Sequence, residues 1–445
     1  MLPIILAPII RLALWIYFRR IEVRGREFIP HNRPLIFVAN HPNVMLDTLL
    51  LAAMIPGRKP HFLAKSTLFK RRLYAFFLRQ LGALAVRRQQ DGAHGGNRDM
   101  FRQACAVLQQ DGALALFPEG GSRAGRQVHT LKPGAARIAL HAAAAGAHQT
   151  CIVPVGLTYT APELFRSDVE LHFGPPIAVA DFLATHQQNR QRAATQLTTA
   201  IHAHLVQLTW HLDSPALAQP IEDATTLYAA RLADEFSANP HLSPHLRAGQ
   251  ALIRAAHHYA ATEPALFDIL SHRLRIYQRK IRRLAFPHPG LPDHEPISPQ
   301  RPLLAIGLAL PALYGLLHNA LPYLLPRLCA RSFQREPEMI STVKFAVGTA
   351  AFPLYYLLRT GVSGVFWGWP SALFYGLTLP LSGLLALYYR ERILATIPLW
   401  KLWATPKRRR AHLEKLNCER RALLADLDQL KERYIAEALT EQHQY

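Results

Sequence analysis

A histidine and an aspartate lie six positions apart in the apolar stretch "ANHPNVMLD", residues 39–47 of this chain. A carboxylate that hydrogen-bonds one imidazole nitrogen fixes the ring tautomer and raises the basicity of the other nitrogen. A histidine beside apolar residues is more often a satisfied core residue, but His41 follows a strand-like run and Pro42 is typical of a helix start. We therefore expect His41 and Asp47 to be a candidate general-base pair where a strand ends.

A second polar stretch, "FPEGGSRAG" over residues 117–125, also follows a strand-like run. Glu119 is a carboxylate in an otherwise apolar turn, and the glycines after it let backbone N–H groups approach a ligand closely. The alternative is a tight turn in which Glu119 only caps a helix. "LKPGAARIAL" (131–140) follows and supplies a turn and a helix that can pack beneath this stretch.

Two arginines, Arg87 and Arg88, end a third strand-like run, "GALAVRR" over residues 82–88. A guanidinium group binds phosphate through two parallel hydrogen bonds, so arginines at a strand end suit an anionic ligand. The alternative, a solvated basic edge, is common.

Strand-like and helix-like patterns alternate between residues 20 and 180 and predict an α/β fold, a largely parallel sheet flanked by helices. Such sheets bind ligands beyond the carboxyl ends of their strands, which is where the three polar stretches fall. The expected strands are 35–40, 82–86, 112–117, 151–159 and 169–174, and the expected helices are 43–55, 97–110 and 134–147.

The sequence predicts five segments: a membrane-interface helix (1–19), the α/β domain (20–180), a helical extension with a Pro-rich linker (181–300), a transmembrane region (301–390) and a basic tail (391–445). Trp15 and Tyr17 are expected at the level of lipid headgroups, although a buried N-terminal helix is equally consistent.

Two apolar runs in the transmembrane region, 303–326 and 361–389, exceed the roughly 20 residues that a spanning helix needs. The shorter run 343–358 is expected to span, re-enter or lie flat. "KRRR" (407–410) follows the last run, so the positive-inside rule predicts a multi-pass protein whose catalytic domain faces the cytoplasm. Leucines at three- and four-residue steps in the tail predict either a coiled coil or an amphipathic helix docked on its own chain.

Composition agrees with a membrane-associated protein that meets an anionic partner. Of the 445 residues, 50% are hydrophobic and 18% are charged, and the formal net charge is +21. Nucleic acid, an anionic membrane and phosphorylated substrates all fit that charge, but no nucleic-acid-binding motif is present and we expect no such partner. The 4 cysteines lack CxxC spacing, so neither a metal site nor a disulfide framework is expected.

Taken together, four blocks in this order resemble the glycerolipid acyltransferase superfamily, which includes glycerol-3-phosphate, lysophosphatidate and dihydroxyacetone-phosphate acyltransferases. Asn40-His41…Asp47 is similar to the first block of that family and Gly82 to Arg88 to the second. Phe117-Pro118-Glu119-Gly120 matches the third, and Val153-Pro154 the fourth. The resemblance covers residues 20–180 and says little about the remainder.

The resemblance implies acyl transfer from a thioester of coenzyme A or acyl carrier protein to a hydroxyl of glycerol 3-phosphate or a lysophospholipid, with membrane lipids as further partners and no cofactor. His41 would remove the hydroxyl proton and Asp47 would orient its ring. Amides of Gly120 and Gly121 would stabilise the oxyanion, and Glu119 would order the turn or hold an acceptor hydroxyl. Arg88 and Arg123 would hold the acceptor phosphate, and Ser122 completes this substrate-binding turn.

One feature departs from the family pattern, because five residues rather than four separate His41 from Asp47. An extra residue within one helix would rotate Asp47 by about 100°. We therefore expect the helix to begin after Pro42 or Asn43, with the extra residue absorbed in the turn. If it does not, Asp47 is structural.

Two other functions remain open from the sequence. One is an inactive acyltransferase-like membrane tether, which the altered His–Asp spacing favours. The other is a serine hydrolase using Ser122, although "GGSRA" has alanine where the GxSxG motif has its last glycine.

Overall fold

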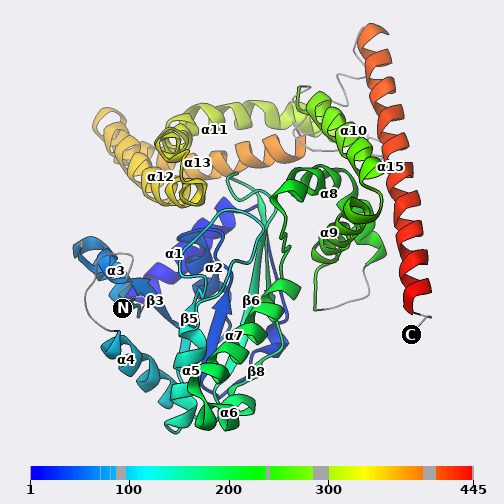
Figure 1. Ribbon diagram of the computed structural model, residues 1–445. Coiled ribbons are helices and arrows are strands. Elements are labelled where there is room, and N and C mark those ends of the chain that lie inside the picture. Colours follow the sequence, from blue (N-terminus) through cyan, green and yellow to red (C-terminus); the bar gives the residue numbers. More distant parts are fainter. Residues whose placement is uncertain are drawn as a thin grey trace. The chain divides into compact units, whose positions relative to one another are not determined.

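The computed structural model describes residues 2–70, 72–80, 82–86, 97–236, 241–283, 300–393 and 407–442. The chain divides into two compact units, labelled by their elements in Figure 1. The first unit comprises Met1–Asp213, Ser237–Arg247 and Ala330–Phe345, and the second comprises Ser214–Phe236, Ala248–Cys329 and Ala346–Tyr445.

The described residues of the first unit form an 8-stranded sheet in the order β1-β7-β6-β2-β5-β3-β4, with β8 paired to β6. Pairing is parallel except where β6 meets β7 and β8. The strands are β1 (Arg20–Arg24), β2 (Leu35–Ala39), β3 (His61–Lys65), β4 (Leu84–Val86), β5 (Ala113–Leu116), β6 (Cys151–Tyr159), β7 (Asp168–Phe173) and β8 (Ile177–Ala178). The predicted α/β fold with a largely parallel sheet is therefore confirmed.

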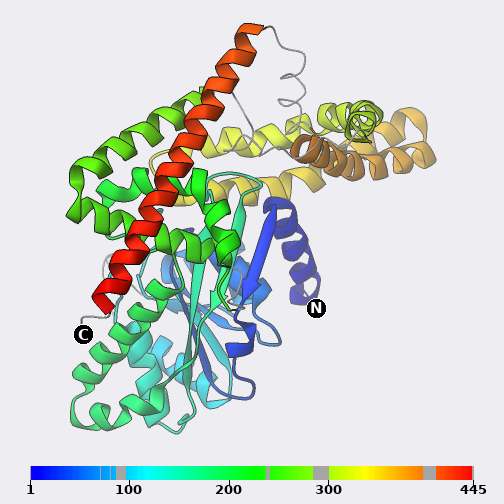
Figure 2. The same ribbon diagram turned by 90° about the vertical axis from the view of Figure 1, so that its right-hand side faces the viewer.

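Helices cover both faces of this sheet, as Figures 1 and 2 show. Along β2, Ile36 and Val38 pack with α4, α5 and α7, whereas Leu35 and Phe37 pack with α1 and α2. The alternation follows from the two-residue repeat of a strand, and burial on both faces explains why β2 is apolar throughout. The helices are α1 (Leu2–Tyr17), α2 (Leu46–Met54), α3 (Arg72–Gln80), α4 (Arg98–Gln109), α5 (Gly134–Ala144), α6 (Leu183–Gln188) and α7 (Arg190–Gln207).

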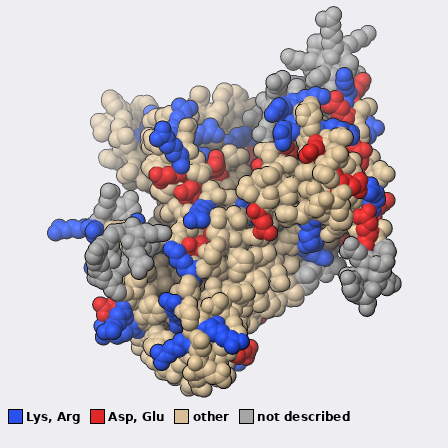
Figure 3. All heavy atoms as spheres, viewed as in Figure 1, with Lys and Arg blue, Asp and Glu red and all other residues tan. Residues whose placement is uncertain are grey.

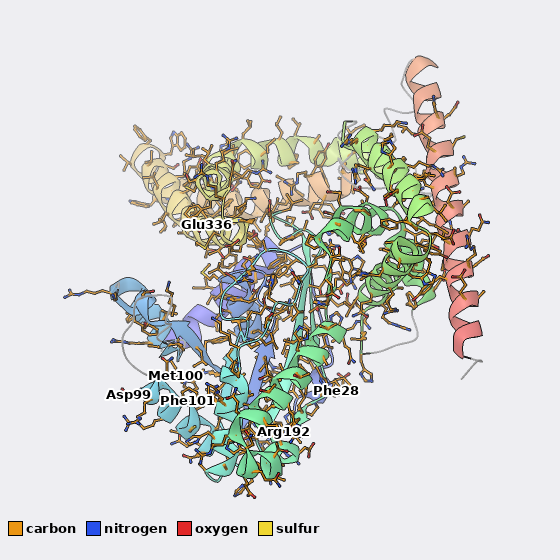
Figure 4. All side chains as sticks on the ribbon, in the orientation of Figure 1. Phe28, Asp99, Met100, Phe101, Arg192 and Glu336 are labelled. Atoms are coloured by element: carbon orange, nitrogen blue, oxygen red, sulfur yellow. The ribbon has the colours of Figure 1, made fainter. Side chains whose placement is uncertain are left out.

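The helix α4 illustrates how an amphipathic pattern sets orientation. Met100 is buried and joins the core beside the sheet, whereas its neighbour Asp99 is exposed (Figure 4). Successive positions on a helix differ by about 100°, so one residue faces the core while the next faces solvent.

The helix α1 packs one face on the sheet and leaves the other exposed. Leu14 and Tyr17 are buried, whereas Leu12 and Trp15 are 56% and 61% exposed. The expectation that Tyr17 lies at headgroup level is therefore wrong, because its ring packs edge-on against Phe345 instead. The exposed apolar face still suits an interfacial helix, with Trp15 on that face.

The second unit is helical. Its described helices are α8 (Pro215–Glu235), α9 (Pro244–Thr262), α10 (Pro264–Arg283), α11 (Gln300–Ala330), α12 (Pro337–Trp367), α13 (Trp369–Tyr388) and α15 (Lys407–Gln442); α9 and α12 begin in the first unit. Two described stretches, Leu304–Phe333 and Trp369–Glu391, are long and apolar enough to cross a membrane. Most of the predicted Pro-rich linker, 286–299, lies outside the described residues.

The tail helix α15 docks on its own chain. Leu416, Leu423 and Leu427 are buried with Tyr228 of α8 and Tyr277 of α10. Ion pairs flank this apolar seam, including Lys280–Glu419 and Arg273–Asp426, and Figure 3 shows basic and acidic side chains interspersed along the helix. The amphipathic alternative for the tail is therefore the arrangement observed.

Candidate active site

The first polar stretch begins where β2 ends, and Asn40 anchors it. The Asn40 side-chain amide donates to the carbonyl oxygen of Leu157 at 2.9 Å, and the Leu157 N–H donates to Asn40 Oδ1 at 2.7 Å. Asn40 is buried, so both bonds form away from solvent. The side chain thereby replaces backbone pairing where β2 ends beside β6, and it fixes the position at which His41 leaves the sheet.

The structure brings His41 and Asp47 together despite the extra residue between them. His41 Nδ1 lies 2.8 Å from Asp47 Oδ2. The helix α2 begins at Leu46, later than expected, so the residues from Pro42 to Met45 form a turn that absorbs the insertion. With Nδ1–H donating to the carboxylate, the lone pair of His41 is on Nε2, the nitrogen required for a base.

Asp47 is fully buried and accepts two further hydrogen bonds. The Tyr159 hydroxyl donates to Oδ1 at 2.5 Å, and the Asn43 N–H donates to Oδ2 at 2.7 Å. Burial raises the pKa of the Asp47 carboxyl, and its three hydrogen-bond donors act in the opposite direction. Burial also raises the pKa of Tyr159 well above its ordinary value, so this hydroxyl stays protonated and remains a donor.

Tyr159 was not predicted as a site residue, because a tyrosine ending a buried strand gives no sequence signal beyond packing. Its position at the end of β6, beside β2, places the hydroxyl next to Asp47. The tyrosine thus holds the carboxylate through Oδ1, the oxygen that is not bonded to His41.

Replacing Tyr159 with phenylalanine is expected to lower kcat for acyl transfer about three- to tenfold and stability by about 1.5–3 kcal/mol. The ring packing is retained, but a hydrogen bond to a charged group is lost. Tyr228→Phe is the matched control, because Tyr228 also donates to a carboxylate, Asp428 Oδ1, at 2.5 Å in the second unit. Steady-state kinetics and denaturant unfolding of Tyr159→Phe and Tyr228→Phe are the measurements. Equal losses of kcat in the two variants would contradict a role of Tyr159 at the site.

The second polar stretch lies against the first. The Phe117 ring stacks on the His41 ring with centroids 3.9 Å apart and planes 9° apart. Glu119 Oε1 accepts the His41 N–H at 3.1 Å, and the Arg123 N–H donates to the His41 carbonyl oxygen at 3.1 Å. The loop 117–123 therefore orients His41 through its ring and its backbone.

Burial raises the pKa of Glu119 from 4.5 to about 7, although the hydrogen bond from the His41 backbone opposes this shift. The folded protein consequently binds the Glu119 proton more tightly than the unfolded chain does. Between about pH 4.5 and 7, the native state loses stability as pH rises, and above pH 7 the full cost of the buried charge is present.

Glutamine at position 119 is therefore expected to stabilise the protein at pH 8 by about 2–3 kcal/mol, and by far less at pH 5. The neutral amide retains an oxygen to accept the His41 N–H but avoids the buried charge. Thermal unfolding of Glu119→Gln at both pH values is the measurement, with the exposed Glu163→Gln as control. A stabilisation by Glu119→Gln that is the same at both pH values would show that Glu119 is not a buried carboxyl with a raised pKa.

The glycine turn supplies only part of the expected oxyanion site. Gly120 adopts φ +78°, a conformation that favours glycine, and its N–H donates to the Phe117 carbonyl oxygen at 3.2 Å. The Gly120 amide is thus already paired within the turn, and the expected oxyanion donor in the Gly120-Gly121 turn stays a prediction. In the described part of the chain, the Gly121 N–H makes no hydrogen bond to another backbone group.

A hollow of about 650 Å³ adjoins this loop. Arg123 and Lys132 are among its lining residues, and the side chain of Lys132 lies over Gly120. The other lining residues are Glu119, Gln127, Val128, His129, Thr130, Leu131, His202, His211 and Asp213. Two fixed cations in a concave site suit a phosphate or another small anion.

The hollow includes residues that sequence reasoning did not select as site residues. "LKPG" was noted as a turn but not as the source of a cation, and His202 on α7 lies about 80 positions beyond Glu119. Burial and the nearby Arg123 lower the pKa of His129, so this imidazole is neutral at physiological pH. Arg123 and Lys132 are the arginine and lysine side chains among the lining residues.

The remaining predicted site residues are Arg88 and Ser122. Arg88, with Arg87, lies outside the described residues. Ser122 lies in the loop 117–123, and within the described residues no hydrogen bond joins it to a histidine. Among the described residues, the hydrolase alternative therefore lacks the serine–histidine contact that it requires.

The acyltransferase family model matches residues 20–158. An uncharacterised acyltransferase of Schizosaccharomyces pombe is 23% identical over 269 residues, which are 40% of this chain and 40% of that protein. A 1-acyl-sn-glycerol-3-phosphate acyltransferase of Streptococcus pneumoniae is 27% identical over 201 residues, 44% of this chain and 69% of that protein. Glycerol-3-phosphate O-acyltransferase 2 of Saccharomyces cerevisiae is 37% identical over 84 residues, 19% of this chain and 11% of that protein.

The chain thus spans about two fifths of the length of the S. pombe relative. The matched segment contains β1 to β5, all of β6 except its last residue, and with them His41, Asp47 and Glu119. It ends at residue 158, one position before Tyr159. Residues 20–158 therefore match the acyltransferase family, in agreement with the resemblance of the four sequence blocks.

Proposed function

We propose that this protein is a membrane-bound O-acyltransferase of phospholipid biosynthesis. It moves a fatty acyl group from an acyl thioester to a hydroxyl of glycerol 3-phosphate or lysophosphatidate, with His41 as general base. The observation that carries the proposal is the pair of hydrogen bonds that His41 Nδ1–H and the Tyr159 hydroxyl donate to the Asp47 carboxylate.

The proposed reaction uses His41 and Asp47 together. His41 Nε2 takes the proton of the acceptor hydroxyl as its oxygen attacks the thioester carbon, and the buried Asp47 stabilises the imidazolium that forms. The Gly121 amide is the donor that supports the oxyanion. Collapse of the tetrahedral intermediate breaks the carbon–sulfur bond, and the imidazolium returns the proton to the leaving thiolate. No covalent enzyme intermediate is needed.

The hollow beside Glu119 supports a phosphorylated acceptor. Arg123 and Lys132 provide two cations there, and the Arg123 backbone is bonded to His41. A phosphate held by these cations would leave the rest of the acceptor near the loop that orients the base. Arg88 remains a proposed second phosphate ligand on the strength of its sequence block alone.

Apolar surface supports attachment to a membrane. In the second unit, the described helices expose large apolar side chains, among them Leu310, Val365 and Phe374. Exposed apolar surface of this extent is costly in water and suits lipid. Spanning helices α11 and α13, a multi-pass arrangement and a cytoplasmic catalytic domain are parts of this proposal.

The test offers purified full-length protein a labelled acyl-CoA and, separately, glycerol 3-phosphate, lysophosphatidate or monoacylglycerol, which has no phosphate. Acylation of a phosphorylated acceptor and little acylation of monoacylglycerol are expected. The faster of the two phosphorylated acceptors identifies the substrate. Absence of transfer to every acceptor, with both acyl-CoA and acyl carrier protein as donors, would favour the inactive tether instead.

A further inference from the structure

The turn between His41 and Asp47 exchanges hydrogen bonds with a residue about 300 positions away in sequence. Thr342, on the first turns of α12, belongs to the same compact unit as the site. The Met45 N–H donates to Thr342 Oγ1 at 3.1 Å. The Thr342 hydroxyl in turn donates to Asn43 Oδ1 at 3.4 Å, a long bond between two buried side chains.

These contacts meet a specific requirement of the long His–Asp turn. The first N–H groups of a helix have no partner within the helix and need one elsewhere. Met45 is the residue that precedes α2, and its own side chain makes no capping hydrogen bond. Thr342 supplies an acceptor to the Met45 N–H, and it therefore marks where α2 begins.

The start of α2 decides where Asp47 points. Asp47 is the second residue of the helix, and a start displaced by one residue would rotate its side chain by about 100° about the helix axis. Such a rotation would separate the carboxylate from both His41 Nδ1 and the Tyr159 hydroxyl. A turn with five intervening residues thus needs a restraint on its length, and Thr342 provides one.

The segment carrying Thr342 is held in place independently of that hydroxyl. Lys344 Nζ donates to the Glu163 carbonyl oxygen at 2.6 Å, and the Ser341 hydroxyl donates to the Pro162 carbonyl oxygen. The buried Phe345 ring packs edge-on against Tyr17. Loss of the Thr342 hydroxyl alone should therefore leave the segment docked.

We propose that Thr342 is a positioning residue for the His41–Asp47 pair, and that it acts by fixing the start of α2 through Met45 and Asn43. Only the expected effect on kcat rests on the proposed function; the effect of Thr342 on the start of α2 does not. Residues 337–345 are by this account required for acyl transfer, although they lie far outside the matched segment 20–158.

Two variants of the full-length protein separate the hydroxyl from the shape of the side chain. Thr342→Val keeps the branched shape without the hydroxyl, and kcat is expected to fall about tenfold with KM for acceptor and acyl-CoA within about twofold. Thr342→Ser keeps the hydroxyl and should retain at least about half of kcat. Ser341→Ala is the matched control, because it removes a neighbouring buried hydroxyl that does not touch the turn.

Hydrogen exchange of the peptide spanning residues 40–50 gives a second readout that needs no activity. Faster exchange in Thr342→Val, with normal exchange in Thr342→Ser and Ser341→Ala, supports the proposal. Unchanged kcat and exchange in Thr342→Val overturn it, as does an equal loss in Ser341→Ala, which would indicate docking of α12 instead. If the wild-type protein transfers no acyl group, the proposed function is wrong, and exchange alone decides whether Thr342 fixes the turn.

Discussion

Replacing His41 with alanine should lower kcat for acyl transfer by about 10²–10⁴-fold, the contribution typical of a general base. The acceptor hydroxyl is a weak nucleophile while it keeps its proton, and alanine offers nothing to remove that proton. His41 is only partly exposed, and the Phe117 ring that stacks on it can relax into the space that alanine leaves. The folded state is therefore expected to persist, with KM for both substrates little changed.

His258→Ala is the matched control for this variant. His258 Nε2 lies 2.9 Å from Glu437 Oε2, so its removal also breaks a histidine–carboxylate contact, but in the second unit. Its kcat should equal that of the wild-type protein. Retention of more than a tenth of wild-type kcat in His41→Ala would exclude His41 as the base.

The second large effect is expected from Asp47→Asn, a loss on the order of 10³-fold in kcat. Three donors converge on Asp47: the His41 ring, the Tyr159 hydroxyl and the Asn43 amide. An asparagine has one acceptor oxygen, so its NH₂ group must face at least one of these donors. Mispairing favours the other imidazole tautomer, in which Nε2 carries the proton and no longer acts as a base.

Asp223→Asn tests whether this loss is specific. Asp223 is also buried and accepts a side-chain hydrogen bond, from Gln219 at 3.0 Å in the second unit. Both variants should lose about 1–3 kcal/mol of unfolding free energy, because each leaves buried groups poorly paired. Only Asp47→Asn should lose kcat. Comparable kcat in Asp47→Asn and the wild-type protein would make the aspartate a structural residue.

The buried strands of the sheet were predictable because their residues are apolar on both faces. The runs 35–40 and 151–159 correspond to β2 (Leu35–Ala39) and β6 (Cys151–Tyr159) with at most one residue of difference at either end. β1 and β3 escaped prediction. The first, "RIEVR", is charged, and the second, "HFLAK", contains only three apolar residues before its lysine. Neighbouring strands, rather than local pattern, determine such segments.

The site likewise contains residues that the sequence predicts and residues that it does not. His41, Asp47 and Glu119 were selected because each chemical group follows a buried strand, and parallel strands end at one edge. The later start of α2 was not predictable, because its restraint comes from Thr342 on a distant helix. Lys132 and His202 likewise reach the hollow only through tertiary folding.

The most direct test of the central claim is product formation by the purified full-length protein from labelled acyl-CoA and, in separate reactions, glycerol 3-phosphate and lysophosphatidate, with wild type and His41→Ala followed in parallel. The account predicts a labelled acylated product from at least one of these acceptors with the wild-type protein, and at most about a hundredth of that rate with His41→Ala. Free fatty acid as the main labelled product, or equal rates of acceptor acylation by the two proteins, would contradict it.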